Sequence, residues 1–389
     1  MKKTRVAFFA ELLVEGLDGA TRTMFQLFRR IPQQQFEFLF ICGVGPKQIG
    51  GFECVHVPTL TLPINSTYKV ALPALVKRSL RERLDAFNPD VIHIATPALL
   101  GEFAIKYAQL TQRPVISIYH THFISYIDYY LKHAPFLISY VKNKMAAGHK
   151  AFYNQCDVMY VPSESLAGEL AGIGIDQSVM KIWKRGIDKQ LFSPAKKDKA
   201  ALQQLTRNHY PTILFASRLV WEKNLETLIN TYHHLKALDI KFNLVIAGDG
   251  TARKELETQL PDAIFTGKIS HEQLSVLFAS VDLFLFPSVS ETYGNVVLEA
   301  MASGLPCVIA DGGGSKDFIE QGINGFKCDP YDETDYSDKI ISLLNSPHLC
   351  SQFSEEGLAY TQSFDWTQLA HIYFEDLHKL AAAEVLETA

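Results

Sequence analysis

No stretch of this 389-residue sequence approaches the roughly 20 consecutive apolar residues that a membrane-spanning helix needs. The amino end, MKKTRVAFFAELLVEG, starts with basic residues and a short apolar core, as a secretory leader does. Glu11 and Glu15 interrupt that core, and no small-residue cleavage site follows, so we interpret it as the first strand of a domain. We therefore expect a cytoplasmic protein, at most associated with the inner face of the cell membrane.

The six cysteines form no C-x-x-C pair and have no histidine at zinc-finger spacing. Free cysteine packs as a small hydrophobic side chain, so reduced thiols, no metal and no cofactor are expected. The sequence also has no G-x-G-x-x-G fingerprint, which argues against a dinucleotide-dependent dehydrogenase. We find neither internal repeats nor low-complexity segments.

The net charge of −5 is unevenly distributed along the chain. Residues 1–188 carry 21 basic and 15 acidic side chains, whereas residues 189–389 carry 16 and 27. A basic first half fits an anionic partner such as a membrane surface or a phosphorylated acceptor, although ordinary scatter of surface charge gives the same count. Residues 68–84 combine basic and apolar positions, which predicts either a membrane-surface helix or a surface helix packed on its own domain, interrupted by Pro73. No nucleic-acid partner is expected.

Short apolar runs alternate with amphipathic stretches throughout, which predicts an α/β protein with parallel sheets. Residues 193–210 are polar and break this alternation, so we interpret them as a linker between two doubly wound domains, 1–190 and 191–365. The tail, residues 366–389, has apolar side chains at helical spacing. The expected strands are residues 5–10, 36–42, 91–95, 115–119, 158–161, 212–216, 242–247, 263–266, 283–286 and 306–309.

Ligands of doubly wound folds bind beyond the carboxyl ends of strands, and residues 282–306 have the richest such loop. A buried strand is followed by Glu291 in the loop, and Glu299 lies about one turn inside the helix that Gly294 and Asn295 begin. Carboxylates accept hydrogen bonds from hydroxyls, and the free amides of a first helical turn attract phosphate. This combination fits a nucleotide-sugar site better than a pair of catalytic acids.

Arg218 and Lys223 follow the first strand of the second half and come just before a helix. Cations are disfavoured at a helix start by roughly 0.3–1 kcal/mol, so two of them there indicate a diphosphate ligand rather than solvated charges. Gly248 and Lys268 lie in later loops of the same kind, which suit a base and a ribose. The GGGSK sequence at 312–316 has the wrong order for a phosphate loop and is interpreted as a glycine-rich turn.

The first half offers weaker candidates. Gly19 lies where a loop turns into a helix, and a simple turn explains it equally well. His120 opens a cluster of hydroxyls and imidazoles after a strand. Two histidines two positions apart make a poor metal site, so contact with sugar hydroxyls is the favoured interpretation. Arg185, in KRGID, ends the first domain and is expected to line its ligand-facing side.

Together these residues resemble a known family. E-x7-E from Glu291 to Glu299, R-x4-K from Arg218 to Lys223, and the strings YHTHF, RGID, SRLVWEKNLETL and ETYGNVVLEAMASGLP are similar to GT-B-fold glycosyltransferases of glycosyltransferase family 4. The branch with the strongest similarity includes bacterial glycolipid mannosyltransferases and sulfoquinovosyl-diacylglycerol synthases. The resemblance covers nearly the whole chain.

The resemblance implies two Rossmann-like domains facing a cleft, with the tail helix crossing back to the first domain. It also implies a sugar nucleotide donor and retention of anomeric configuration without a metal. The residue roles that it implies are as follows: Arg218 and Lys223 on the diphosphate, Glu291 on the donor sugar, Glu299 on the ribose, the amides of Gly294 and Asn295 on the phosphates, His120 beside the anomeric carbon and Gly19 facing a phosphate.

The chain departs from the family pattern at Asp18, His122 and Ser217, which concerns the sugar and the acceptor more than the donor clamp. The leading hypothesis is a retaining transferase that moves a hexosyl group from GDP-mannose to a lipid-linked or other hydroxyl acceptor. The alternatives are a UDP-sugar-dependent glucosyl or sulfoquinovosyl transferase, and a sugar-nucleotide-binding subunit without activity.

Overall fold

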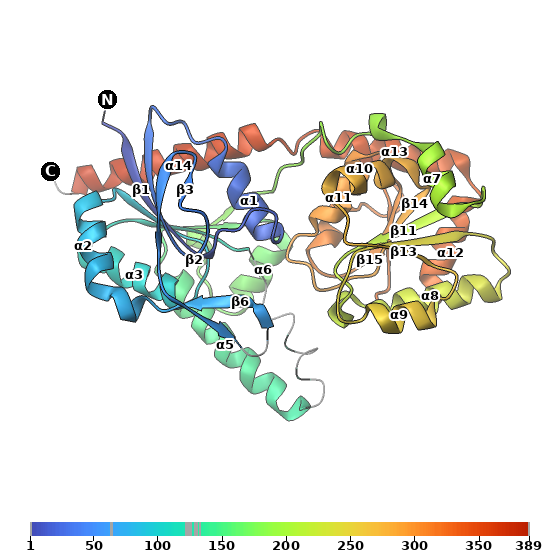
Figure 1. Ribbon diagram of the computed structural model, residues 1–389, viewed down its shortest axis with the longest axis horizontal. Coiled ribbons are helices and arrows are strands. Elements are labelled where there is room, and N and C mark those ends of the chain that lie inside the picture. The colour runs from blue at the N-terminus through green and yellow to red at the C-terminus, as the bar shows by residue number, and fades with distance from the viewer. Residues whose placement is uncertain (1, 63–64, 121–126, 128–130, 132–133, 388–389) are drawn as a thin grey trace. The chain divides into compact units, whose positions relative to one another are not determined.

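The computed structural model describes residues 2–62, 65–120, 127, 131 and 134–387. They form two compact units, each with a sheet covered by helices (Figure 1). The first unit holds residues 2–120, Ala134–Arg185 and the helix from Trp366 onward, and the second holds Gly186–Asp365. The chain passes from the first unit to the second after Arg185, earlier than the boundary after residue 190 that the sequence suggests.

The sheet of the first unit is parallel apart from a short strand at one edge. Its order is β10-β9-β8-β7-β1-β2-β4-β3, and only the β3–β4 pair is antiparallel. A separate antiparallel ribbon pairs β5 with β6. The strands are β1 (Thr4–Leu12), β2 (Phe36–Val44), β3 (Gln48–Ile49), β4 (Phe52–His56), β5 (Thr59–Leu62), β6 (Asn65–Ala71), β7 (Val91–Ile94), β8 (Val115–Ile118), β9 (Val158–Val161) and β10 (Met180–Ile182).

Both faces of this sheet are buried, which explains the continuous apolar run of β1. Val6 and Phe8 point into one core, and Ala7 and Phe9 point into the other. A strand buried on both faces has few positions that suit a polar side chain. Helices cover the faces: α1 (Gly19–Phe28), α2 (Lys77–Phe87), α3 (Leu99–Thr111), α5 (Ile138–Tyr153), α6 (Glu164–Gly172) and α14 (Trp366–Glu387), with 3₁₀ turns at Pro73–Val76, Pro135–Leu137 and Gln177–Val179.

The C-terminal helix α14 is part of the first unit. Its side chains Trp366, Tyr373, Phe374 and Leu377 are buried in the same core as Phe8. The apolar spacing of the tail therefore reflects one helical face packed on the sheet.

The second unit has a fully parallel sheet in the order β13-β12-β11-β14-β15-β16. The strands are β11 (Thr212–Ala216), β12 (Asn243–Ala247), β13 (Ile264–Gly267), β14 (Leu283–Phe286), β15 (Cys307–Ala310) and β16 (Phe326–Cys328). Strand order runs outward in both directions from β11 and β14. The loops after these two strands therefore diverge at a topological switch point, where such sheets bind ligands.

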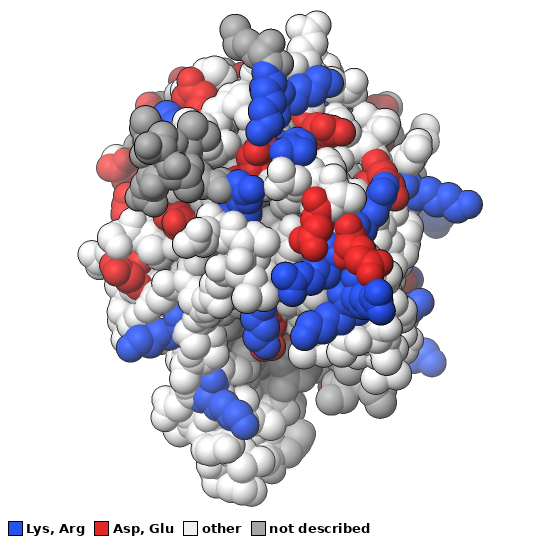
Figure 2. All heavy atoms as spheres, turned by 90° about the vertical axis from the view of Figure 1, so that its left-hand side faces the viewer, with Lys and Arg blue, Asp and Glu red and all other residues white. Residues whose placement is uncertain are grey.

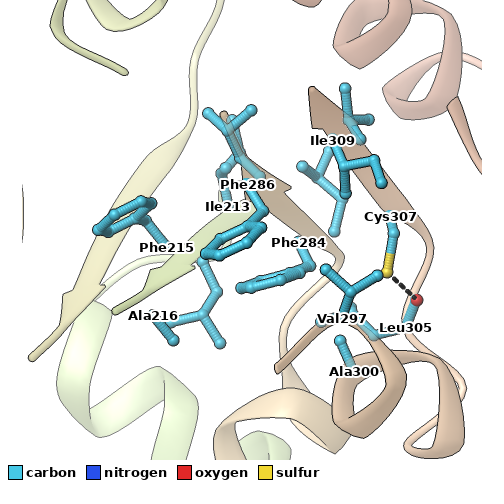
Figure 3. Close-up of a cluster of buried hydrophobic side chains, with 14 of the residues drawn as sticks. Ile213, Phe215, Ala216, Phe284, Phe286, Val297, Ala300, Leu305, Cys307 and Ile309 are labelled. Carbon is cyan, nitrogen blue, oxygen red and sulfur yellow. Dashed lines mark hydrogen bonds between the residues drawn. The ribbon is translucent and has the colours of Figure 1, made fainter. Parts of the chain in front are cut away.

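The helices of the second unit pack on both faces of its sheet. They are α7 (Lys199–Thr206), α8 (Leu225–Ala237), α9 (Arg253–Gln259), α10 (His271–Ser280), α11 (Asn295–Ala302), α12 (Glu333–Leu344) and α13 (Pro347–Thr361), with 3₁₀ turns at Pro194–Lys196, Trp221–Lys223 and Gly314–Phe318. Figure 3 shows Phe215, Phe284 and Phe286 of the sheet beside Val297 and Ala300 of α11. This packing holds α11 against β14 and so fixes where the helix begins.

Two expectations about helices and linkers are wrong. Residues 193–210 are not a linker, because α7 packs on the second unit through the buried Leu202 and Thr206. Residues 68–84 are not one helix, because β6 extends to Ala71 and α2 begins only at Lys77. Among the described residues, no helix is both long and apolar enough to cross a membrane.

Candidate functional site

The loops after β11 and β14 bring one predicted cation and one predicted carboxylate together. Lys223 ends the 3₁₀ turn that precedes α8, and Glu291 lies between β14 and α11. The Lys223 Nζ atom lies 2.6 Å from Glu291 Oε1. The two residues are 68 positions apart in sequence, and they meet at the switch point of the sheet.

Two serines complete this ion pair. Lys223 Nζ donates to Ser290 Oγ at 3.2 Å, and Ser288 Oγ donates to Glu291 Oε1 at 3.3 Å. Ser288 is fully buried and Ser290 nearly so. Sequence reasoning missed both serines, although buried hydroxyls directly after an apolar strand are a usable signal for a polar site.

The surroundings of Glu291 keep it ionised. Burial by itself raises the pKa of its carboxyl, but Lys223, Arg218 and the Ser288 hydroxyl act in the other direction and leave the pKa below its ordinary value. An ionised carboxylate accepts hydrogen bonds and does not donate them. Glu291 is therefore suited to holding hydroxyl groups, and not to acting as a general acid.

The two predicted cations differ in exposure. Lys223 is only 4% exposed, whereas the Arg218 side chain is 63% exposed. Arg218 Nη2 donates to Glu222 Oε1 at 3.2 Å, and Glu222 is itself buried. Arg218 is thus a fork available to an anion, while Lys223 is a buried charge already paired with Glu291.

At the start of α11, the backbone of Gly294 lies very close to Ser315. Gly294 precedes the helix with φ of +84°, and a β-carbon there would lie 2.6 Å from Ser315 Cβ. Asn295 Oδ1 and Ser315 Oγ are buried and have no hydrogen-bond partner among the described residues. Such atoms call for an explanation, and a bound ligand is one. Glu299 lies one turn further along the helix and is buried.

Gly248 and Lys268 follow β12 and β13. Gly248 has φ of +145°, and a β-carbon there would lie 1.8 Å from the Ser217 carbonyl oxygen. Glycine at this position thus lets the loop after β12 pack against the loop that carries Arg218. This is a structural reason for the glycine that does not depend on a ligand. Lys268 is exposed.

In the first unit, the structure joins His120 and Arg185. Arg185 Nη2 donates to the His120 carbonyl oxygen at 3.2 Å, and both residues are buried. Burial, with the charge of Arg185 and the nearby His93, holds the pKa of His120 well below its ordinary value, so the ring is neutral. Neither of its ring nitrogens has a hydrogen-bond partner among the described residues.

Gly19 is the first residue of α1, and Asp18 caps that helix. Asp18 Oδ1 accepts from the Thr21 amide at 2.8 Å, and Thr21 Oγ1 accepts in return from the Asp18 amide at 3.0 Å. The cap occupies one of the free amides that would otherwise bind an anion. The polar residues that follow His120 lie outside the described residues: Thr121, His122, Tyr126, Asp128, Tyr129 and Tyr130.

Sequence reasoning also missed a role for Glu11. It stands at the carboxyl end of β1 and accepts from the Ala71 amide at 2.6 Å and from the Leu100 amide at 3.2 Å. Burial raises the pKa of its carboxyl, although these two backbone bonds act against the shift. The sequence signal that could have identified this role is a carboxylate at the end of an apolar strand.

Comparison with known proteins divides the chain into the same two halves. Residues 17–191 match the family described as Glycosyltransferase Family 4, and residues 196–359 match the family described as Glycosyl transferases group 1. The four residues Arg218, Lys223, Glu291 and Glu299 lie within the second match.

The chain is 32% identical over 339 residues to a GDP-mannose-dependent alpha-mannosyltransferase of Corynebacterium glutamicum, covering 85% of this chain and 78% of that protein. It is 29% identical to sulfoquinovosyl transferase SQD2 of Arabidopsis thaliana, covering 94% of this chain and 71% of that protein. Among solved structures, Anabaena Alr3699/HepE in complex with UDP-glucose has a TM-score of 0.73 at 19% identity, covering 96% of this chain and 99% of that one.

Proposed function

The chain belongs to the GT-B glycosyltransferases of family 4, and on that premise we propose that it transfers a mannosyl group from GDP-mannose, with retention of configuration, to a hydroxyl of a lipid-linked acceptor. That it is a glycosyltransferase acting on a nucleotide sugar follows from the family. The choice of donor rests on the mannosyltransferase relative, which is 32% identical to this chain over 339 residues.

The paired Lys223 and Glu291 carry the proposed chemistry. As the bond between sugar and diphosphate breaks, negative charge develops on the departing diphosphate. Fixed positive groups already in place lower that barrier without reorganisation. We assign Arg218 to the diphosphate as a fork and Lys223 as a charge that both meets the diphosphate and orients Glu291 toward the sugar hydroxyls.

The start of α11 supplies the remaining donor contacts. The amides at Gly294 and Asn295 meet a phosphate, and Glu299 accepts from the ribose hydroxyls. Glycine at 294 suits this role because it keeps the backbone open to a ligand. In this mechanism, side chains and amides perform the charge stabilisation that a divalent cation provides in metal-dependent transferases.

The first unit supplies groups for the reacting sugar. His120 offers a neutral imidazole whose two nitrogens lack partners among the described residues, and we assign it to the donor sugar beside the anomeric carbon, with Arg185 holding its backbone. Gly19 contributes a helix-start amide to a phosphate. Gly248 and Lys268 are assigned to the base and ribose end of the donor.

A thermal-shift panel tests the donor. A ligand that binds the native state raises its melting temperature, so GDP should raise it more than UDP or ADP at equal concentration. A UDP-specific shift would instead support the second candidate, a UDP-sugar-dependent sulfoquinovosyl or glucosyl transferase, which is favoured by the match to SQD2 over 94% of the chain. Nucleotide binding without release of GDP from GDP-mannose and a lipid acceptor would support a non-catalytic subunit.

We also propose that the protein reaches its acceptor by docking on an anionic membrane through the start of α5 and not through α2. The exposed charges of α2 are largely paired, with Arg78 to Glu82 and Arg81 to Asp85. Figure 2 shows acidic and basic side chains interspersed on the face over α2. Such a surface has little net attraction for anionic lipid.

The start of α5 has the opposite character. Phe136, in the 3₁₀ turn just before the helix, is 82% exposed, and Tyr140 on the helix is 64% exposed. The helix extends away from the sheet of its unit (Figure 1). The sequence from 134 to 156 contains no acidic residue, and Lys142 and Lys144 lie on the helix. Exposed aromatic side chains beside lysines are typical of a surface that enters an anionic lipid interface.

Vesicle co-sedimentation tests this docking. Phe136→Asp and Tyr140→Asp should each reduce binding to vesicles containing anionic lipid, most clearly at low salt. Leu110→Asp on α3 is the matched control, because Leu110 is 69% exposed but lies elsewhere. Equal loss in all three variants, or equal binding of the protein to neutral vesicles, would contradict the proposal.

A further inference from the structure

Three side chains of metal-ligand type meet near one edge of the first unit's sheet, apart from the donor residues. Cys42 of β2 and Cys54 of β4 have their sulfur atoms 3.3 Å apart. His56 is also on β4. One of its ring nitrogens and the two sulfur atoms all lie within 4.8 Å of one another. Neither the cysteine spacing nor the proposed transfer reaction accounts for this cluster.

The register of the sheet produces the cluster. Cys42 pairs with His56 across the parallel β2–β4 ladder, and Cys54 pairs with Phe40. Paired residues of neighbouring strands point to the same face, as do residues two apart on one strand. Backbone hydrogen bonds therefore fix all three ligands on one face before any ion arrives.

The same register disfavours a disulfide. Cys54 pairs with a residue two positions before Cys42, so the two cysteines are diagonal neighbours. One strand spacing of about 4.8 Å and two rises of about 3.3 Å place their Cα atoms roughly 8 Å apart. Most disulfides need about 4.4–6.8 Å. The sulfurs approach each other only through their side chains, an arrangement suited to a shared ion.

His56 is held as a metal-binding histidine is held. Its Nε2 atom lies 2.9 Å from the Gly45 carbonyl oxygen, and donation to that oxygen leaves the lone pair of the neutral ring on Nδ1. A backbone carbonyl in this role is the usual partner of a coordinating histidine. His56 is exposed while both thiols are buried, so solvent can reach the cluster from the histidine side.

We propose that Cys42, Cys54 and His56 bind one thiophilic d¹⁰ metal ion, of which Zn²⁺ is the common example. Two thiolates and one imidazole supply three ligands of the tetrahedral set that Zn²⁺ prefers, and water supplies the fourth. Binding releases the two thiol protons to solvent. The ion ties β4 to β2 and so stabilises this edge of the sheet. None of the three ligands is among the residues assigned to the donor.

Titration of the full-length reduced protein with Co²⁺ tests the proposal, because tetrahedral thiolate–cobalt sites absorb visible light strongly. The expected result is one tightly bound ion per chain, displaced by one equivalent of Zn²⁺, with a melting temperature several degrees higher in the loaded protein. His56→Ala should lose most of this absorption. Since His56 is exposed, the variant should fold.

Cys54→Ser should abolish the thiolate–cobalt band, and Cys307→Ser, which changes a buried cysteine outside the cluster, should leave it unchanged. Three results would each overturn the proposal: no cobalt band in the reduced protein, a band that survives His56→Ala and Cys54→Ser together, or spontaneous formation of a Cys42–Cys54 disulfide that mass spectrometry detects in place of metal binding.

Discussion

Lys223 occupies an unusual position for a lysine, because its ammonium group is buried and donates hydrogen bonds to Ser290 and Glu291, which lie 67 and 68 positions further along the chain. A buried charge without a partner costs free energy of folding. Removing the Lys223 ammonium group therefore leaves the Glu291 carboxylate as an unpaired charge in the protein. A single substitution therefore combines a structural effect with any catalytic one, and the two need to be separated.

Lys223→Met should lower transfer by about 100-fold to 1000-fold, the range for losing one preorganised group that stabilises developing charge. It should also destabilise the second unit, because Glu291 loses its ammonium partner. The double variant Lys223→Met with Glu291→Gln should recover stability but not transfer. Steady-state kinetics and melting temperature measure the two effects.

Lys236→Met is the matched control for that pair. Lys236 lies on α8, the helix that follows Lys223, and forms an exposed ion pair with Asp262. Near-normal turnover in Lys223→Met would contradict the role assigned to the ammonium group. Recovery of transfer in the double variant would show that the loss came from structure alone.

Gly294→Ala should impair donor binding more than stability alone explains. The new β-carbon would meet Ser315 at 2.6 Å, on a backbone with φ of +84°. Gly322→Ala has the same kind of backbone, with φ of +74°, and open space around it. Both variants should lose about 1 kcal/mol from the left-handed conformation. Only Gly294→Ala should lose nucleotide affinity, which calorimetry can measure.

The arrangement of the candidate site was partly predictable. Arg218, Lys223 and Glu291 follow predicted strands, and the carboxyl ends of parallel strands share one edge, so their proximity follows from the sequence. That Lys223 is buried while Arg218 is exposed does not, because exposure depends on how the loops pack. Ser290 and Ser315 were missed for the same reason.

The C-terminal helix α14 is coupled to the sheet of its unit through a buried histidine. His93 of β7 stacks on Phe8 with ring centroids 4.0 Å apart, and its Nδ1 atom lies 2.9 Å from the Tyr373 hydroxyl. Burial lowers the pKa of His93 to about 3. The neutral ring can accept a hydrogen bond from the Tyr373 hydroxyl, and the protonated ring cannot.

The first unit should therefore lose stability in acid. The folded pKa of about 3 lies below the unfolded value of about 6.5, so the unfolded chain binds more protons between these values. Stability must fall as pH drops through this window, by up to about 1.4 kcal/mol per pH unit for this residue. His93→Phe should flatten the slope, measured by urea unfolding from pH 6.5 to 4.

Tyr373→Phe is the control for that experiment. It removes the hydroxyl partner and should cost about 1 kcal/mol at every pH, while leaving the slope from His93 in place. An unchanged slope in His93→Phe would place the acid sensitivity in other groups.

The ten expected strands all exist, within one or two residues at each end, because central strands of parallel sheets are continuous apolar runs. The strands that were missed, β3 to β6, β10 and β16, are short or carry polar side chains, and such strands depend on neighbours in space. The polar helix α7 was mistaken for a linker because a helix that buries one stripe needs few apolar residues.

Chelation should separate the two sites proposed for this protein. Transfer should persist within about twofold in EDTA, because the proposed mechanism assigns to Arg218, Lys223 and the helix amides the charge stabilisation that a divalent ion provides in metal-dependent transferases. Loss of transfer that Mg²⁺ or Mn²⁺ restores would contradict that mechanism. A lower melting temperature in EDTA, restored by Zn²⁺ alone, is the separate outcome expected from Cys42, Cys54 and His56.

The position of α14 has a consequence for synthesis. The ribosome completes the second unit, Gly186–Asp365, before it makes the helix that covers one face of the first unit's sheet. Until Trp366, Tyr373 and Leu377 emerge, the core around Phe8 stays open to solvent, and exposed apolar faces aggregate. The half of the protein that is translated first is thus expected to be the last to finish folding, and its core stays incomplete while the second unit is translated.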